Sequence, residues 1–343
     1  MRIKHHLSRL YHEHERVKII LLLGAIFASL IFISINIFED SFYLGQPVKF
    51  GVSFSPTYAA ALGLEPKQVY RAILEDLEVK NIRIPAYWNE IEPIEGKFDF
   101  AELDYYISEA EKHQAKVILA VGYKLFRWPE CRSPGWLALD SEKVREEKIM
   151  NMLKAVIGQY NNNEVVSAFQ LENEPYLPFG VCPGNLSKFF PSELALVRTL
   201  TKKPVIITDS GELRDWIAPA QMADYFGTTI YRKVNAPIVS TFHYPLKPWF
   251  YRLKANFVKA IFAPSLQKLL VAELQAEPWE TEFMSSVPLE KQIKDFPLSA
   301  FQANVLFAKK VGFSENYLWG AEWWYYMKTW GHPEYWNFAK TIL

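Results

Sequence analysis

From Phe50 onward the chain alternates short apolar runs with stretches whose apolar residues recur at helical spacing. The apolar runs predict eight strands, which begin near the following residues: Val48, Lys80, Lys116, Val165, Val205, Tyr225, Leu269 and Tyr317. Two of the stretches between them each place four apolar side chains on one helical face, namely Leu103, Tyr106, Ile107 and Ala110, and then Ile149, Met152, Leu153 and Val156. The pattern therefore predicts eight strand-and-helix units.

Eight such units over roughly 290 residues fit a closed parallel barrel, a fold that takes about 250 residues before insertions. The alternative is a doubly wound open sheet, which would carry a glycine-rich phosphate loop after its first strand. Residues 51–56 read Gly-Val-Ser-Phe-Ser-Pro and supply no such loop. We therefore predict an α/β fold in which residues 48–343 form a single (β/α)8 TIM barrel.

The N-terminal part of the chain has a different pattern. Residues 19–38 carry no charge, and a helix of this length would cover roughly the 30 Å hydrocarbon core of a bilayer. This stretch predicts a transmembrane signal anchor. A cleaved signal peptide is the alternative, but its apolar core is usually only about 7 to 15 residues long.

Charges on the two sides of this stretch predict its orientation. Five basic residues precede it, namely Arg2, Lys4, Arg9, Arg16 and Lys18, whereas Glu39 and Asp40 follow it. Basic flanks stay in the cytoplasm. We expect a cytoplasmic tail over 1–18 and a linker over 39–47, with the barrel membrane-anchored and extracytoplasmic.

Composition narrows the possible partners. Lys and Arg total 38, as do Asp and Glu, so no net field attracts the protein to nucleic acid. Aromatic residues make up 15% of the chain, with 11 Trp, 18 Tyr and 24 Phe. Their flat rings either fill the core or stack on sugar faces.

Two carboxylates follow buried strands. The fourth apolar run ends in Asn173-Glu174-Pro175, and the seventh ends in Glu273. In a TIM barrel the carboxyl ends of the strands form the active-site face. Hydrolysis of a glycosidic bond requires one carboxyl group to protonate the leaving oxygen and another to attack the anomeric carbon. Arg83 in the second strand, Tyr231 at the end of the sixth and Trp319 in the eighth are expected at the same face.

With these residues the chain resembles clan A of the glycoside hydrolases, the retaining barrel enzymes that include cellulases, mannanases, xylanases and some β-galactosidases. The resemblance runs from about Phe50 to about Trp336. It implies Glu174 as acid/base and Glu273 as nucleophile. It also implies Asn173 as the hydrogen-bond partner of the sugar 2-hydroxyl.

The resemblance extends to residues that would bind the substrate or orient the nucleophile. Arg83 and Tyr231 match positions that orient the nucleophile and keep it ionised, and Trp319 matches the ring beneath the cleaved sugar. Trp88 begins a segment that resembles the one after strand two in several members of the clan. His243, in a long stretch after the sixth strand, is a further candidate, with an ordinary turn as the alternative.

Two other glutamates lie near the candidate pair. Glu277 competes with Glu273 for the role of nucleophile, but it lies four residues further along the chain. Glu172 precedes Glu174 by two residues and is expected in a salt bridge inside the barrel. Burial and the charge of Glu273 are expected to raise the pKa of Glu174, which must be protonated to act as an acid.

The sequence therefore predicts a retaining glycosidase that hydrolyses β-linked O-glycosyl bonds of an oligo- or polysaccharide, without a metal or cofactor. An envelope-glycan transglycosylase and a non-catalytic carbohydrate-binding barrel are the alternatives. The sugar, the linkage, endo or exo action and the oligomeric state stay open at this point.

The two cysteines are expected in neighbouring loops of the catalytic face. Cys131 follows the third strand and Cys182 follows the fourth. Outside the membrane an oxidised pair is permitted. We predict a disulfide between them, with two free thiols as the alternative.

Overall fold

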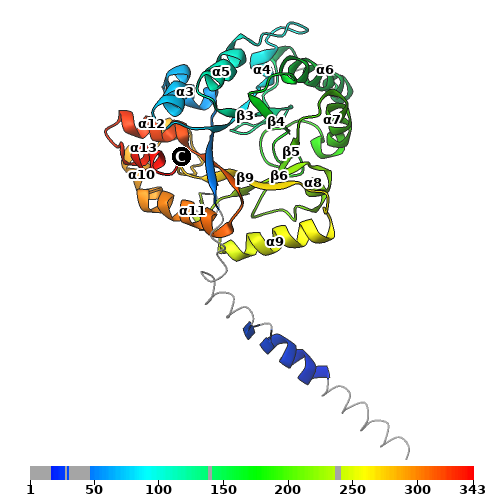
Figure 1. Ribbon diagram of the computed structural model, residues 1–343, viewed down its shortest axis with the longest axis vertical. Helices are drawn as coiled ribbons and strands as arrows, with labels where there is room; N and C mark the ends of the chain where they lie inside the picture. The colour runs from blue at the N-terminus through cyan, green and yellow to red at the C-terminus, as the bar shows by residue number, and fades with distance from the viewer. Residues whose placement is uncertain (1–16, 28, 31–46, 138–140, 236–240) are drawn as a thin grey trace, which may run out of the picture. The chain divides into compact units, whose positions relative to one another are not determined.

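The computed structural model describes residues 17–27, 29–30, 47–137, 141–235 and 241–343. The chain divides into two units, residues 1–45 and 46–343. In the second unit eight parallel strands close into a barrel, and helices surround it (Figure 1). This arrangement confirms the predicted (β/α)8 fold.

The barrel strands follow the predicted pattern closely. In chain order they are β1 (Lys49–Ser53), β2 (Asn81–Pro85), β3 (Lys116–Val121), β4 (Val166–Leu171), β5 (Val205–Asp209), β6 (Tyr225–Ile230), β9 (Lys268–Gln275) and β10 (Glu315–Trp319). Each pairs with its neighbours in the chain, and β1 pairs with β10 to close the ring. Between β6 and β9, the short strands β7 (Lys233–Val234) and β8 (Phe242–His243) form an antiparallel hairpin.

Helices connect successive barrel strands. They are α2 (Pro56–Ala61), α3 (Pro66–Glu75), α4 (Trp88–Ile91), α5 (Ala101–Lys112), α6 (Glu142–Tyr160), α7 (Leu186–Leu200), α8 (Ile217–Met222), α9 (Pro248–Ile261), α10 (Leu289–Asp295), α11 (Leu298–Val311), α12 (Ala321–Thr329) and α13 (Glu334–Lys340), with the 3-10 turns η2 (Gly135–Leu137) and η3 (Met284–Ser286). The two predicted apolar faces are buried on α5 and α6. Hydrophobic periodicity thus identified the sides of these helices that cover the barrel.

The barrel interior is filled by a separate apolar cluster, which consists of Ile118, Ala168, Ile206, Leu270, Ala272 and Tyr317. Another small cluster lies where strands pass into loops, and it consists of Tyr87, Ala120, Leu125, Phe126, Tyr231 and Trp319. Four of its six members carry aromatic rings. The mouth of the barrel at the carboxyl ends of the strands is therefore lined by rings.

The predicted membrane anchor lies only partly within the described residues. Residues 17–27 and 29–30 are helical, whereas residues 28 and 31–38 are outside the described ranges. Among the residues that the structure describes, no helix has the length and apolar character needed to cross a membrane. The anchor over 19–38 stays a prediction.

Candidate active site

Glu273 lies inside β9, two residues before the strand ends, with its carboxylate held by two charged or polar neighbours. Tyr231, the residue after β6, donates its hydroxyl to Oε2 at 2.8 Å. Arg83 of β2 donates from Nη1 to Oε1 at 3.1 Å. Both oxygens therefore have a partner, and the side chain is buried, with 4% of its surface exposed. These are the contacts that the resemblance implies for a nucleophile.

Arg83 connects the two halves of the site. Its Nε donates to Gln170 Oε1 at 2.6 Å, and its Nη2 donates to Asn173 Oδ1 at 2.9 Å. The guanidinium lies over the ring of Phe126, at 3.9 Å from the centroid. Burial lowers the pKa of Arg83, and the charge of Glu273 opposes that shift. The guanidinium still stays charged at neutral pH, because arginine side chains are not deprotonated in proteins.

Glu174 follows β4 in a left-handed backbone conformation, with φ of 45°. This conformation is costly for a residue other than glycine, by about 1 to 3 kcal/mol, and persists only where surrounding contacts enforce it. Here the Glu174 N–H donates to Thr208 Oγ1 at 2.9 Å, and the Glu174 carbonyl accepts from Lys124 Nζ at 3.0 Å. The backbone that carries the candidate acid is thus fixed from two sides.

The carboxyl group of Glu174 is buried, and its Oε1 has no hydrogen-bond partner among the described residues. Burial raises the pKa of Glu174 well above its usual value, and the negative charges of Glu273 and Glu130 raise it further, while Lys124 opposes them. A carboxylic acid in this environment stays protonated where an exposed one would be ionised. The direction of the shift confirms the expectation from the sequence.

Lys124 and Glu130 form a buried ion pair beside Glu174. Lys124 Nζ lies 3.2 Å from Glu130 Oε2, and it also donates to the carbonyl of Leu177 at 2.8 Å. Glu130 Oε1 accepts from Asn173 Nδ2 at 3.3 Å. Burial raises the pKa of Glu130 to about 7, and Lys124 opposes this shift. The pair therefore holds both the loop of Glu174 and the amide of Asn173.

Replacement of Glu130 by glutamine is expected to move the alkaline limb of the pH–rate profile to lower pH. The negative charge of Glu130 contributes to the raised pKa of Glu174. Without that charge, Glu174 loses its proton at lower pH, and with it the form that acts as acid. The measurement is kcat/KM against pH on an aryl glycoside.

A matched control for this prediction is Glu315→Gln. Glu315 begins β10 and pairs with Lys268, which begins β9, so both lie at the opposite end of the barrel. This variant is expected to keep the alkaline limb of the wild type. An unchanged limb in Glu130→Gln would show that Glu130 does not influence the group that titrates there.

Trp319, the last residue of β10, lies beside a second buried ionic cluster. Arg127 stacks on Trp319 at 3.9 Å and on Tyr58 at 3.7 Å, measured from Cζ to the ring centroids. It pairs with Glu277, and with Glu322 at 3.2 Å. Glu277 is thus engaged by Arg127, while Arg83 and Tyr231 contact Glu273. The geometry favours Glu273 over Glu277 as the nucleophile.

Glu172 is not in the salt bridge that its sequence position suggested. Its carboxylate accepts from the backbone N–H groups of Tyr123 and Lys124, at 2.7 and 2.5 Å. On its other side is Glu193 of α7, whose pKa is raised well above its usual value by burial and by the charge of Glu172. The expectation failed because φ of 56° at Glu172 breaks the regular alternation of a strand.

Two predicted substrate-binding residues lie apart from this constellation. Trp88 is 1% exposed, donates to Glu92 Oε2 at 2.7 Å and packs edge-on against Tyr123 and Trp136. It belongs to the main core rather than to the mouth of the barrel. His243 is exposed on the β7–β8 hairpin. The structure does not bring either side chain to the candidate carboxylates.

The predicted disulfide between Cys131 and Cys182 is present. It joins the loop after β3 to the loop after β4, and the Val181 N–H donates to the Pro129 carbonyl at 2.9 Å beside it. The two loops carry Glu130 and Glu174. The disulfide therefore connects the backbone segments that hold the candidate acid and its ion-paired neighbour.

The double variant Cys131→Ser/Cys182→Ser is expected to lower the free energy of unfolding by about 2 to 4 kcal/mol, because the cross-link limits the unfolded chain. The two cysteines are separated by 51 positions. Denaturant unfolding of the oxidised protein and the variant measures the difference. Equal midpoints and slopes for the two proteins would contradict the prediction.

Sequence reasoning missed Lys124, Arg127 and Glu130 as parts of the site. All three lie in the irregular loop after β3, where no periodicity indicates which side chains are buried. The sequence feature that could have identified them is the alternation of charged and aromatic residues over 123–132, which read Tyr-Lys-Leu-Phe-Arg-Trp-Pro-Glu-Cys-Arg. In this segment Lys124, Arg127 and Glu130 all lie in buried ion pairs.

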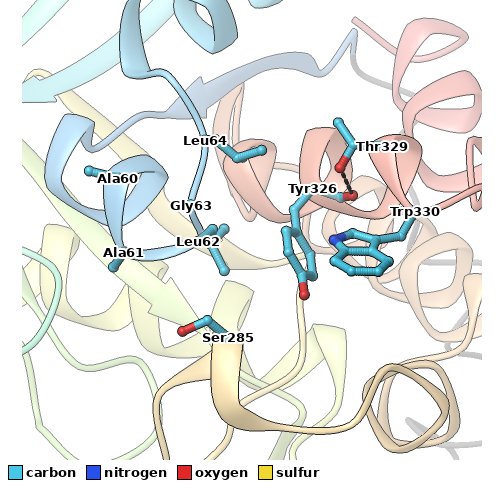
Figure 2. A pocket seen from close by; sticks show the side chains of 9 residues that line it. All are labelled: Ala60, Ala61, Leu62, Gly63, Leu64, Ser285, Tyr326, Thr329 and Trp330. Atoms are coloured by element: carbon cyan, nitrogen blue, oxygen red, sulfur yellow. Dashed lines mark hydrogen bonds between the residues drawn. The ribbon is translucent and has the colours of Figure 1, made fainter.

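A separate hollow of about 460 Å³ lies between α2 and the end of α12. Figure 2 shows the rings of Tyr326 and Trp330 on one side of it and the segment around Gly63 on the other. None of its lining residues is one of the candidate carboxylates. Within the described ranges, no three His, Cys, Asp or Glu side chains are grouped so that they could hold a metal ion.

Comparison with known proteins confirms the resemblance to clan A. Residues 68–141 match the model of the glycoside hydrolase family 42, described as β-galactosidase. This segment contains Arg83, Lys124 and Glu130, but neither Glu174 nor Glu273. None of the curated proteins has a sequence that matches the chain.

Solved structures with a similar fold include β-galactosidases and xylanases. The β-galactosidase of Halorubrum lacusprofundi has a TM-score of 0.52 and 14% identity, covering 79% of this chain and 52% of its own. Xylanase 10B of Thermotoga maritima has a TM-score of 0.55 and 11% identity, and the match covers 81% of this chain and 85% of the xylanase. The chain spans about half the length of the β-galactosidases that it matches. These likenesses show the barrel fold.

Proposed function

We propose that this chain, whose family 42 segment lies within a barrel of the clan A type, is a retaining glycoside hydrolase that cleaves β-linked O-glycosyl bonds. The observation that carries the proposal is the contrast between its two central carboxyl groups. Glu273 is held by Arg83 and Tyr231, whereas burial and neighbouring negative charge favour the protonated form of Glu174. An acid and a nucleophile in one site are what retaining hydrolysis requires.

In the proposed first step, Glu273 attacks the anomeric carbon while Glu174 protonates the departing oxygen. A covalent glycosyl-enzyme forms, and Glu174 is left ionised. Glu174 then takes a proton from water, which attacks the same carbon and releases the sugar with its original anomeric configuration. Asn173 is positioned by Arg83 and Glu130 to donate its free amide hydrogen to the 2-hydroxyl.

The test is hydrolysis of a panel of 4-nitrophenyl β-glycosides, including the galactoside and the xyloside, with the product anomer followed by NMR at early times. The names of the similar structures, β-galactosidases and xylanases, suggest these two sugars first. The expected first product is the β-anomer. A first product with the α-configuration would exclude the double-displacement mechanism.

We also propose that the barrel acts outside the cytoplasm, held by a membrane anchor over residues 19–38. The basic tail and the uncharged stretch support this orientation. The disulfide supports it as well, because disulfides persist in oxidising compartments. Protease added to intact cells is expected to remove the barrel and to spare a tag at Met1. A digested tag with a protected barrel would show the opposite orientation.

A further inference from the structure

Four aromatic rings form a continuous series from the nucleophile to the surface of the protein. The hydroxyl of Tyr231 donates a hydrogen bond to Glu273. The ring of Tyr231 lies 4.8 Å from that of Trp279 in edge-on contact. Trp279 lies 6.0 Å from Phe179, and Phe179 lies 6.0 Å from Trp128. All distances join ring centroids. The series begins at the candidate reaction centre and reaches solvent.

The outer two rings are exposed to solvent. Trp128 is 55% exposed and Phe179 is 39% exposed. Trp279 is partly buried and packs against the aromatic cluster at the barrel mouth. An exposed apolar surface next to a reaction centre usually marks a binding site.

The loops that carry these rings are fixed rather than loosely attached. The Cys131–Cys182 disulfide lies three residues from each of Trp128 and Phe179. Gly180 has φ of 91°, and a Cβ there would lie 3.0 Å from the Pro129 carbonyl oxygen, so a side chain at this position would strain the contact between the two loops. The two rings are therefore presented on a braced pair of loops, as a binding surface requires.

We propose that Trp128, Phe179 and Trp279 form a sugar-binding subsite for the leaving-group side of a β-linked oligo- or polysaccharide. This inference rests on the proposed function and adds a substrate class to it. Phe179 follows Glu174 by five residues in the same loop, and Glu174 is the group that would protonate the leaving oxygen. The ring series therefore extends on the side where the leaving group departs.

The ligand of this subsite is the apolar face of a pyranose ring. The C–H groups on that face contact a flat aromatic ring, while the hydroxyl groups at the edge stay in water. An aromatic contact of this type contributes enough to change affinity by about tenfold. The substrate is then a chain of at least two linked sugars rather than a glycoside with a small aglycone.

The test compares two substrates of different length in Trp128→Ala and Phe179→Ala. Xylotetraose and β-1,4-linked galactotetraose are each set against the 4-nitrophenyl β-glycoside of the same sugar. The ratio of kcat/KM for the tetraose to that for the aryl glycoside is expected to fall about tenfold in either variant. A ratio within about twofold of the wild type in both variants would overturn the proposal.

Trp330→Ala is the matched control. Trp330 is also an exposed tryptophan, at 61%, but it lines the separate hollow in Figure 2. Its ratio is expected to equal that of the wild type. An equal fall in Trp330→Ala would show that the loss does not come from the proposed subsite.

A binding measurement separates this inference from the proposed function. In the Glu273→Ala background the tetraoses stay intact, so calorimetric titration measures affinity without turnover. Adding Trp128→Ala is expected to raise Kd about tenfold, whether or not the wild type proves to be a hydrolase. Equal Kd values, or no binding of either tetraose, would overturn the subsite.

Discussion

Glu273→Ala is expected to lose at least about 10⁴-fold in kcat on every substrate that the wild type cleaves. Proton transfer by a side chain usually contributes about 10² to 10⁴-fold, and loss of the nucleophile removes the covalent route altogether. Arg83 and Tyr231 both direct their donors at this one carboxylate. The measurement is steady-state hydrolysis of the best aryl β-glycoside, with thermal unfolding to verify that the variant folds.

Tyr231→Phe is expected to give a smaller loss of activity than Glu273→Ala. It keeps the carboxylate and removes the hydroxyl that donates to Oε2 at 2.8 Å. A hydrogen bond to a charged group contributes about 1.5 to 3 kcal/mol, so a loss of roughly ten- to hundredfold is expected. If Glu273→Ala kept near-normal activity while Glu277→Ala abolished it, Glu277 would be the nucleophile instead.

Most of the barrel was predictable because its strands are buried on both faces. A strand between barrel interior and helix layer is a short apolar run, and such runs contrast with the helical periodicity around them. All eight predicted starts lie within two residues of the observed ones, the largest difference being Tyr317 against Glu315 in β10. A predicted strand start differs from the observed one where strand pairing includes a polar residue. This is the case at Glu315, which pairs with Lys49 of β1.

The central part of the candidate site was predictable for a related reason. Glu273, Tyr231 and Arg83 lie in or next to barrel strands, so strand order alone brings them to one face. The surrounding ion pairs were not predictable, because loop geometry determines which charges are buried. Lys124 and Glu130 meet because their loop folds back on itself, with Lys124 and Cys131 paired in an antiparallel bridge.

Trp88 illustrates the opposite error. It lies three residues after the end of β2, in a segment whose resemblance to members of the clan implied a substrate-binding residue. In the structure it begins α4, and its indole N–H donates inward to Glu92. A strand end specifies the position of the backbone, whereas the direction of the side chain depends on the turn that follows.

Glu174→Ala is expected to respond to the leaving group. The sugar that departs from an oligosaccharide leaves as an alkoxide unless its glycosidic oxygen is protonated. Cleavage of an oligosaccharide should therefore fall by about 10² to 10⁴-fold, the usual contribution of general acid catalysis. A 2,4-dinitrophenyl glycoside needs no proton to depart. With that substrate the first step should survive while water attack slows, and a stopped-flow burst of dinitrophenol should report the accumulating glycosyl-enzyme.

Azide then distinguishes the two carboxylates by stereochemistry, because it is small enough to enter either vacated position. In Glu174→Ala the glycosyl-enzyme still forms, so azide replaces water on it and gives the β-glycosyl azide, with retention. In Glu273→Ala no such intermediate exists, so azide attacks directly and gives the α-glycosyl azide, with inversion. NMR of the isolated azides identifies the anomer. The same anomer from both variants, or wild-type rates in both, would contradict the assignment of acid and nucleophile, because a double displacement requires the two groups to act on opposite sides of the anomeric carbon.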